Sequence, residues 1–275
     1  MKIAFRVDAS LNIGTGHVMR CLCLADKLRN CGAESVFLCR DHIGNLHEVV
    51  RDRGYPILSL GGIDVAPVAD ASRANWLGVD SKRDADDTRT RLSGRAIDWL
   101  IIDHYGIDAT WESSLRSSCG HIMVIDDLAD RDHEADLLMD QNLGTTERDY
   151  ATRVSSSCKL LLGPSYALLR PEFAALRTES LSRRNRGHLR RILITMGGVD
   201  LNNATGAVLE ALEIAAPSAS LDVKVVMGLN APWRGQVIEQ AKQSSLPTEV
   251  LVNVRCMGDL MLEADLVIGA AGSTA

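Results

Sequence analysis

A histidine follows a glycine-rich turn near the beginning of the sequence. The stretch NIGTGHVMRCLCLA, residues 12–25, places Gly14 and Gly16 just before His17, and an apolar segment typical of a β-strand precedes it. A helix that begins here points the positive end of its dipole at the imidazole, which disfavours the protonated ring. A neutral imidazole near pH 7 is what a general base requires. We therefore predict that His17 is a catalytic base, the alternative being a histidine that caps the helix or packs in the core.

The turn GTGHVM differs from the common nucleotide-binding turns. Dinucleotide sites carry G-x-G-x-x-G, and Met19 stands where the third glycine belongs. No G-K-S or G-K-T follows, so the turn is not a P-loop. We expect no cofactor here and interpret Gly14 and Gly16 as positions where the backbone lets a substrate approach.

Two further apolar segments, LIIDHYGID and VIDDLADRDH, end in polar residues. These residues are Asp103, His104, Tyr105, Asp126 and Asp127. A single aspartate in such a place usually caps a turn, and the convergence of several indicates a site. Asp103, Tyr105 and Asp127 are therefore candidates for substrate binding, and a carboxylate could alternatively orient the imidazole of the predicted base. No spacing resembles a set of metal ligands, so we expect no metal.

The second half of the sequence contains two turns of small residues. In ITMGGVDLNNATG, residues 194–206, a strand leads through Gly197 and Gly198 into a helix that Asn202 or Asn203 should cap. The other turn, in IGAAGSTA at the end of the sequence, contains Gly272, Ser273 and Thr274. Such turns bind phosphate through backbone N–H groups at helix N-termini, although ordinary connections look the same. The pair predicts a diphosphate site.

Short apolar segments alternate with amphipathic ones along the whole chain. Strands are expected at 2–7, 35–39, 56–60, 98–103, 121–126, 159–162, 191–195, 221–226, 249–252 and 265–268. Helices are expected at 17–31, 44–53, 82–93, 108–118, 203–215, 232–244 and 257–263. This alternation indicates βαβ units with parallel sheets. We predict an α/β fold of two doubly wound, Rossmann-like domains that face each other across a cleft.

A polar, basic stretch separates the two series of elements. AALRTESLSRRNRGHL, within 174–189, shows no clear apolar period and is interpreted as a linker. The predicted domains are then 1–173, which carries the catalytic base, and 190–275. The sequence ends on a strand and a turn without the helix that should follow. We therefore expect the second domain to be a C-terminal truncation.

The composition is that of an acidic globular protein. Hydrophobic residues make up 46% and charged residues 24% of the chain, which predicts a packed core. The formal net charge of −6 argues against nucleic acid or an anionic membrane surface as a partner. No secretory leader is visible, and no stretch of about 18 apolar residues could span a membrane. The seven cysteines form no C-x-x-C pair, and such reduced thiols indicate a cytoplasmic protein.

Five segments, in order along nearly the whole chain, resemble one enzyme family. They are FRVDASLNIGTGHVMRCLCLA, IIDHYGID…WE, VIDDLADRDHEADLLMDQN, LLGPSYALLRPEF and ILITMGGVD…N. They resemble the UDP-sugar hydrolases of the pseudaminic-acid pathway, which are similar in turn to the murein-pathway N-acetylglucosaminyltransferase and its glycosyltransferase-B fold. The resemblance implies hydrolysis of UDP-2,4-diacetamido-2,4,6-trideoxy-β-L-altropyranose to UDP and the free sugar, which feeds a sugar used on flagellins.

The resemblance also implies roles for individual residues. The family's catalytic histidine corresponds to His17 and the tyrosine of its D-H-Y-G motif to Tyr105, while its diphosphate-binding turns correspond to Gly197, Gly198, Gly272, Ser273 and Thr274. The first domain would bind the sugar and the second would bind UDP. Two other functions remain open, a UDP-sugar-dependent glycosyltransferase that uses the same base and a nucleotide-sugar-binding subunit without chemistry. We expect a monomer, although the residues leave the oligomeric state open.

Overall fold

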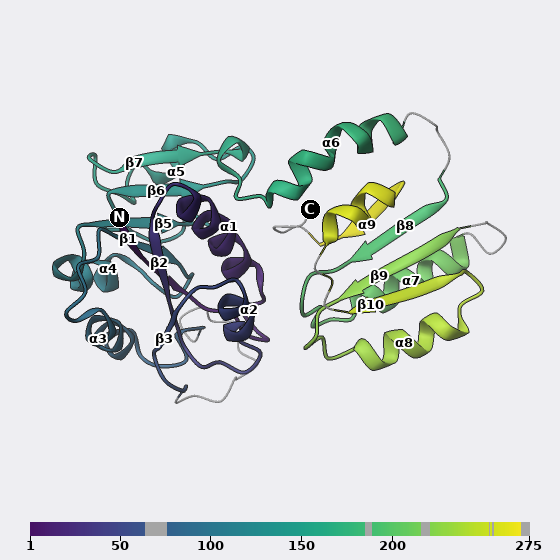
Figure 1. The fold of residues 1–275 in the computed structure, drawn as a ribbon, viewed down its shortest axis with the longest axis horizontal. Helices are drawn as coiled ribbons and strands as arrows, with labels where there is room; N and C mark the ends of the chain where they lie inside the picture. Colours follow the sequence, from purple (N-terminus) through teal and green to yellow (C-terminus); the bar gives the residue numbers. More distant parts are fainter. Residues whose placement is uncertain (64–75, 185–188, 216–220, 253, 255, 271–275) are drawn as a thin grey trace. The chain divides into compact units, whose positions relative to one another are not determined.

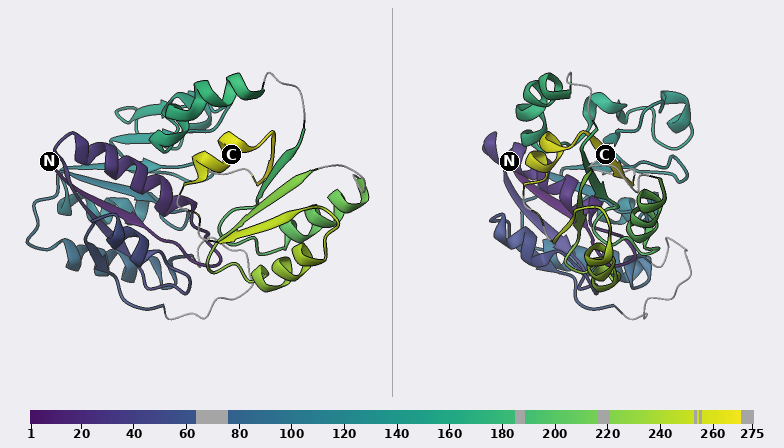
Figure 2. Two further views of the ribbon diagram at one scale, coloured as in Figure 1. Left: turned by 45° about the vertical axis from the view of Figure 1, so that its right-hand side comes forward. Right: turned by 90° about the vertical axis from the view of Figure 1, so that its right-hand side faces the viewer.

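The computed structural model describes residues 1–63, 76–184, 189–215, 221–252, 254 and 256–270. The chain divides into two compact units, Met1–Leu168 and Leu169–Ala275, and each contains its own parallel β-sheet with helices on both faces (Figures 1 and 2). Within the described ranges, no helix is both long and apolar enough to cross a bilayer.

The sheet of the first unit contains seven parallel strands. They are β1 (Lys2–Val7), β2 (Glu34–Cys39), β3 (Ile57–Ser59), β4 (Trp99–Asp103), β5 (His121–Ile125), β6 (Leu137–Asp140) and β7 (Lys159–Leu162). Their order is β3-β2-β1-β4-β5-β6-β7, so the chain builds outward in one direction from β1 and in the other from β4. The carboxyl ends of β1 and β4 therefore flank the topological switch point, where doubly wound sheets bind ligands.

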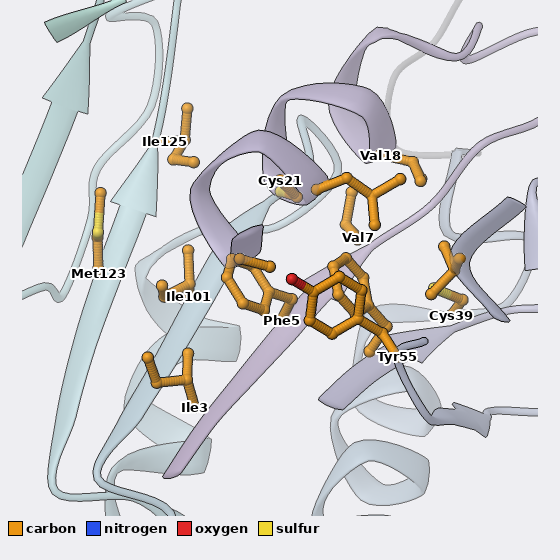
Figure 3. Close-up of a cluster of buried hydrophobic side chains, with 14 of the residues drawn as sticks. Ile3, Phe5, Val7, Val18, Cys21, Cys39, Tyr55, Ile101, Met123 and Ile125 are labelled. Carbon is orange, nitrogen blue, oxygen red and sulfur yellow. The ribbon is translucent and has the colours of Figure 1, made fainter. Parts of the chain in front are cut away.

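Helices cover both faces of this sheet because the side chains of each strand alternate. They are α1 (Gly16–Asn30), α2 (His47–Asp52), α3 (Ser81–Leu92), α4 (Ala109–Leu115) and α5 (Glu147–Tyr150), with 3-10 turns η2 (Arg116–Ser118) and η3 (Pro164–Tyr166). Ile3, Phe5 and Val7 of β1 share a buried cluster with Cys21 of α1 (Figure 3). Ala4 lies in a second cluster, on the face that α3 and α4 cover.

A buried charged network lies on this second face. Asp84 of α3 accepts hydrogen bonds from Arg6 at 2.7 Å, from Arg40 at 2.9 Å and from the indole N–H of Trp111 at 3.1 Å. Arg6 also pairs with Asp8 at 2.8 Å, and all four charged side chains are fully buried. Burial opposes ionisation of Asp84, but the guanidiniums beside it hold its pKa below the usual range. The network ties α3 and α4 to the carboxyl half of the sheet.

The N-terminus of α4 depends on one side-chain cap. Asp108 accepts the N–H groups of Thr110 at 3.0 Å and Trp111 at 3.2 Å. Asp108→Ala should therefore lower the free energy of unfolding by about 1 kcal/mol, whereas Asp108→Asn, which keeps an acceptor oxygen, should be nearly neutral. Urea denaturation of the two variants measures the difference. Equal losses in both would contradict a capping role.

The second unit has a smaller parallel sheet in the order β10-β9-β8-β11. Its strands are β8 (Arg191–Thr195), β9 (Asp222–Met227), β10 (Thr248–Val252) and β11 (Leu266–Gly269), and its helices are α6 (Pro171–Arg184), α7 (Ala204–Ala215), α8 (Arg234–Gln243) and α9 (Met257–Glu263). α6 packs on α9, where Glu172 accepts the N–H of Gly258 at 3.1 Å and Arg183 donates to the carbonyl of Leu262 at 2.7 Å.

The predicted α/β fold with doubly wound sheets is confirmed, and all ten predicted strands are present within one residue at each end. The main difference concerns 174–189, which we predicted as a linker. The structure has α6 over most of this stretch, in the second unit, while 185–188 lie outside the described residues. The helix was missed because its apolar contacts begin at Phe173, just before the polar stretch, and continue with Leu176. The cleft and the truncation remain predictions.

Candidate active site at the switch point of the first unit

His17 is the second residue of α1, and a tight loop joins it to the end of β1. In that loop Ser10 accepts the N–H of Ile13 on its hydroxyl at 2.9 Å and the N–H of Gly14 on its carbonyl at 2.9 Å. Gly14 has a φ of +82°, a conformation that favours glycine. Gly16 has no such backbone requirement, and a Cβ there would meet no described atom within 4 Å. The fold alone therefore does not require glycine at position 16.

The imidazole of His17 is held by a carboxylate. Its Nδ1 lies 2.6 Å from Oδ1 of Asp103, the last residue of β4, and both residues are buried. Burial opposes ionisation of Asp103, but the charge of Arg20 and the hydrogen bonds from Arg20 and His17 hold its pKa well below the usual range. Asp103 is therefore a carboxylate that accepts a hydrogen bond, so Nδ1 of His17 carries a proton. In the neutral ring, Nε2 then has the free lone pair that a base needs.

Arg20, which lies in none of the predicted site positions, joins two of the predicted carboxylates. Its Nε and Nη2 donate to the two oxygens of Asp103, both at 2.6 Å, and its Nη1 donates to Oδ2 of Asp127 at 2.6 Å. Arg20 lies one turn after His17 on α1, so both side chains share one face of the helix. The sequence signal that could have found it is the i, i+3 spacing of His17 and Arg20, which puts the arginine beside the predicted base on a helix.

Tyr105 completes the group from the turn after β4. Its hydroxyl donates to Oδ2 of Asp127 at 2.5 Å, and its ring meets the imidazole of His17 edge-on at a centroid distance of 4.6 Å. Burial, together with the charge of Asp127, raises its pKa, so the phenol stays protonated. Trp76 stacks on Tyr105 at 5.7 Å. No motif near Trp76 pointed to this position.

The structure thus brings together four predicted site residues and separates two others. His104 projects to the opposite face of the sheet, where its Nδ1 accepts the N–H of Gly106 at 3.0 Å and its Nε2 lies 3.4 Å from Asp8. Burial lowers the pKa of His104, so it is neutral and structural. Asp126 accepts the hydroxyl of Tyr150 at 2.8 Å and turn N–H groups, which is the capping role.

In the described part of the chain, no three histidine, cysteine, aspartate or glutamate side chains are arranged to hold a metal ion. None of the cysteines in this part of the chain is joined to another in a disulfide.

The glycine turn of the second unit follows β8, and Gly197 there has a φ of +84°. Asn203 caps α7 as predicted, because its side chain accepts the N–H of Gly206 at 3.2 Å. Asp200 additionally accepts the N–H groups of Ala204 at 2.8 Å and Thr205 at 2.9 Å. The first amides of α7 are thus already bonded to a carboxylate, which the sequence analysis did not foresee. Gly198 lies in the same turn, whereas Gly272, Ser273 and Thr274 lie outside the described residues.

Comparison with solved structures defines the class of fold. The chain is similar to MurG of Acinetobacter baumannii, with a TM-score of 0.58 and 15% sequence identity over 99% of this chain and 73% of that one. The structure therefore has a glycosyltransferase-B-type fold. No protein-family model matches the sequence.

Two curated proteins are distant relatives in sequence. The UDP-2,4-diacetamido-2,4,6-trideoxy-beta-L-altropyranose hydrolase of Campylobacter jejuni is 28% identical over 203 residues, which is 74% of this chain and 62% of that protein. A Methanocaldococcus jannaschii protein described as uncharacterized is 25% identical over 279 residues, covering all of this chain and 52% of that protein. The chain thus spans between about half and three fifths of the length of these relatives.

Proposed function

We propose that the chain is a hydrolase that cleaves UDP-2,4-diacetamido-2,4,6-trideoxy-β-L-altropyranose to UDP and the free sugar. One observation carries the proposal: the Nδ1 of His17 is bonded to an ionised carboxylate, which leaves Nε2 to take a proton at the carboxyl edge of the sheet. The distant Campylobacter jejuni relative, whose name states this activity, supports the substrate.

In the proposed reaction, water attacks the anomeric carbon with inversion. Nε2 of His17 removes a proton from the water as its oxygen forms the new C–O bond. The bond between the anomeric carbon and the phosphate oxygen breaks, and its electron pair leaves with UDP. Asp103 stabilises the imidazolium that forms. A base of this kind contributes about 10² to 10⁴ in rate.

The sugar is proposed to bind beside the base. Oδ1 of Asp127 is buried and makes no hydrogen bond to any described residue, so it has an acceptor position for a sugar hydroxyl or an amide N–H. Gly16, where a Cβ would meet no described atom within 4 Å, directly precedes His17, and the ring of Tyr105 lies against the imidazole. Gly14 shapes the loop that presents Gly16 and His17.

The second unit is proposed to bind UDP through the turns that contain Gly197, Gly198, Gly272, Ser273 and Thr274. The first N–H groups of α7 already donate to Asp200. The diphosphate would therefore accept hydrogen bonds from the backbone of the turn before α7, unless Asp200 moves away. UDP is a good leaving group, so we propose that neither a metal nor a catalytic acid is needed, in contrast to ordinary glycosidases. The reaction would serve pseudaminic-acid synthesis and flagellin glycosylation in the cytoplasm.

Turnover in ¹⁸O-labelled water without any sugar acceptor tests the proposal. Because the base activates water at the anomeric carbon, we expect the label in the sugar and none in UDP, with the same result in EDTA. Mass spectrometry of both products, with proton NMR of the anomeric signal, measures this. Label in UDP would mean attack at phosphorus, and a requirement for both magnesium and an acceptor would indicate a metal-dependent transferase.

A further inference from the structure

The guanidinium of Arg20 is almost fully enclosed by the side chains of the candidate site. Its side chain is 7% exposed, and three separate N–H groups donate to three carboxylate oxygens. Two of these oxygens belong to Asp103 and one to Asp127. Only a planar fork of donors reaches three oxygens in this way, whereas a lysine ammonium is a point charge on a flexible chain.

The cluster formed by His17, Arg20, Asp103 and Asp127 has charges that nearly balance. Two carboxylates and one guanidinium leave a net charge of −1 while His17 is neutral. The other titratable groups that face the cluster add no charge. Burial raises the pKa of the Cys21 thiol and of the Tyr105 phenol, so both stay protonated and neutral. Arg131 lies beyond the ring of Tyr105 and pairs with Asp126, 3.0 Å away. One proton on His17 therefore brings the cluster to neutrality.

We propose that Arg20 is the positioning residue of the hydrolysis, acting through Asp103 and Asp127 without touching the substrate. It bonds both to Asp103, which orients His17, and to Asp127, which holds Tyr105, and so joins the two carboxylates in one rigid group. Its charge also offsets that of one of the two carboxylates, which reduces the negative charge around His17. This inference rests on the proposed hydrolase function.

Two variants separate the charge of Arg20 from its geometry. Arg20→Gln removes the charge, which leaves Asp103 and Asp127 without the guanidinium that they share. We expect kcat to fall about tenfold or more with KM little changed, and the acidic limb of the pH–rate profile to move up by about one pH unit. Arg20→Lys keeps the charge and loses the fork, so kcat should fall similarly while the acidic limb moves much less. The lysine variant also covers the case in which the glutamine variant fails to fold.

Arg40→Lys is the matched control. Arg40 is fully buried and also bridges two carboxylates, Asp84 and Asp87, on the opposite face of the sheet. This variant should lose stability like the Arg20 variants but keep the wild-type kcat and pH profile. If Arg20→Lys and Arg20→Gln keep both properties, or if Arg40→Lys changes them equally, the positioning role is wrong.

A spectroscopic measurement separates this inference from the proposed function. ¹⁵N NMR of the His17 ring reports which nitrogen carries the proton and the pH at which the ring titrates, with or without turnover. In wild type we expect the proton on Nδ1, and in Arg20→Gln titration at a higher pH. If the two proteins differ in this titration but the wild type releases no sugar, the proposed hydrolase function is refuted while the role of Arg20 in positioning His17 stands. Identical titration in both proteins would refute the role of Arg20 alone.

Discussion

Replacing His17 by asparagine should lower kcat by about 10² or more, with substrate binding changed by no more than a few-fold. Asparagine has a comparable size and can still hydrogen-bond to Asp103, but it cannot accept a proton at neutral pH. The interaction lost is one made in the transition state, which is why kcat and not KM should carry the effect. Steady-state kinetics with the UDP-sugar measure both constants.

The same substitution at His121, an exposed histidine at the start of β5, is the control and should leave kcat unchanged. A His17→Asn variant with normal kcat and a raised KM would make His17 a binding residue. A variant that fails to fold would support the alternative of a core histidine.

Asp103→Asn should reduce both activity and stability. An amide carries no charge to stabilise the imidazolium, and it can turn its NH₂ toward Nδ1, which favours the wrong tautomer of His17. In a serine protease the corresponding change lowers kcat by about 10⁴. We therefore expect Asp103→Asn to lower kcat by about 10³ or more. Arg20 also loses its bidentate carboxylate and keeps Asp127 as an ionised partner. Removing one partner of a buried ion pair lowers the free energy of unfolding by about 3–5 kcal/mol. Because Arg20 still pairs with Asp127, we expect a loss of about 3 kcal/mol for Asp103→Asn.

The pH dependence of stability provides a second readout for this variant. Because the pKa of Asp103 is lower in the folded chain, its contribution to stability is present above the unfolded-state value of about 3.9. It is lost as the pH falls from there toward the folded-state pKa. Asp103→Asn should therefore flatten the acid limb of a plot of stability against pH. Asp84→Asn is the control, because Asp84 is an equally buried and paired aspartate. It should lose stability but retain kcat per folded molecule. Equal losses of kcat in Asp84→Asn and Asp103→Asn would contradict a special role for Asp103.

The strands were predictable because they are short apolar segments, several of which have a polar residue at the carboxyl end. Asp103 and Asp127 follow such segments, and parallel strands align these ends along one edge of the sheet. Strand β6 escaped prediction because its short apolar segment directly follows the highly charged stretch 126–136. Periodicity is weak over so short a segment.

The pairing of side chains within the site could not be read from the sequence. Arg20 is 83 residues from Asp103 and 107 from Asp127, and their contact follows from the packing of α1 across the ends of β4 and β5. Trp76 reaches Tyr105 from a segment with no motif of its own. The bond between Asp200 and the amides of α7 likewise depends on a local backbone conformation with a φ of +47° at Asp200.

Strand β4 has little tolerance for insertions and deletions. Asp103 and His104 are consecutive, and the alternation of the strand sends one to the face of α1 and the other to the buried network around Asp8. A one-residue slip would exchange the two faces for every side chain that follows it. The carboxylate that orients His17 and the histidine that supports the opposite layer would then be lost together. Length changes in related chains should therefore accumulate in the connecting loops and spare this strand.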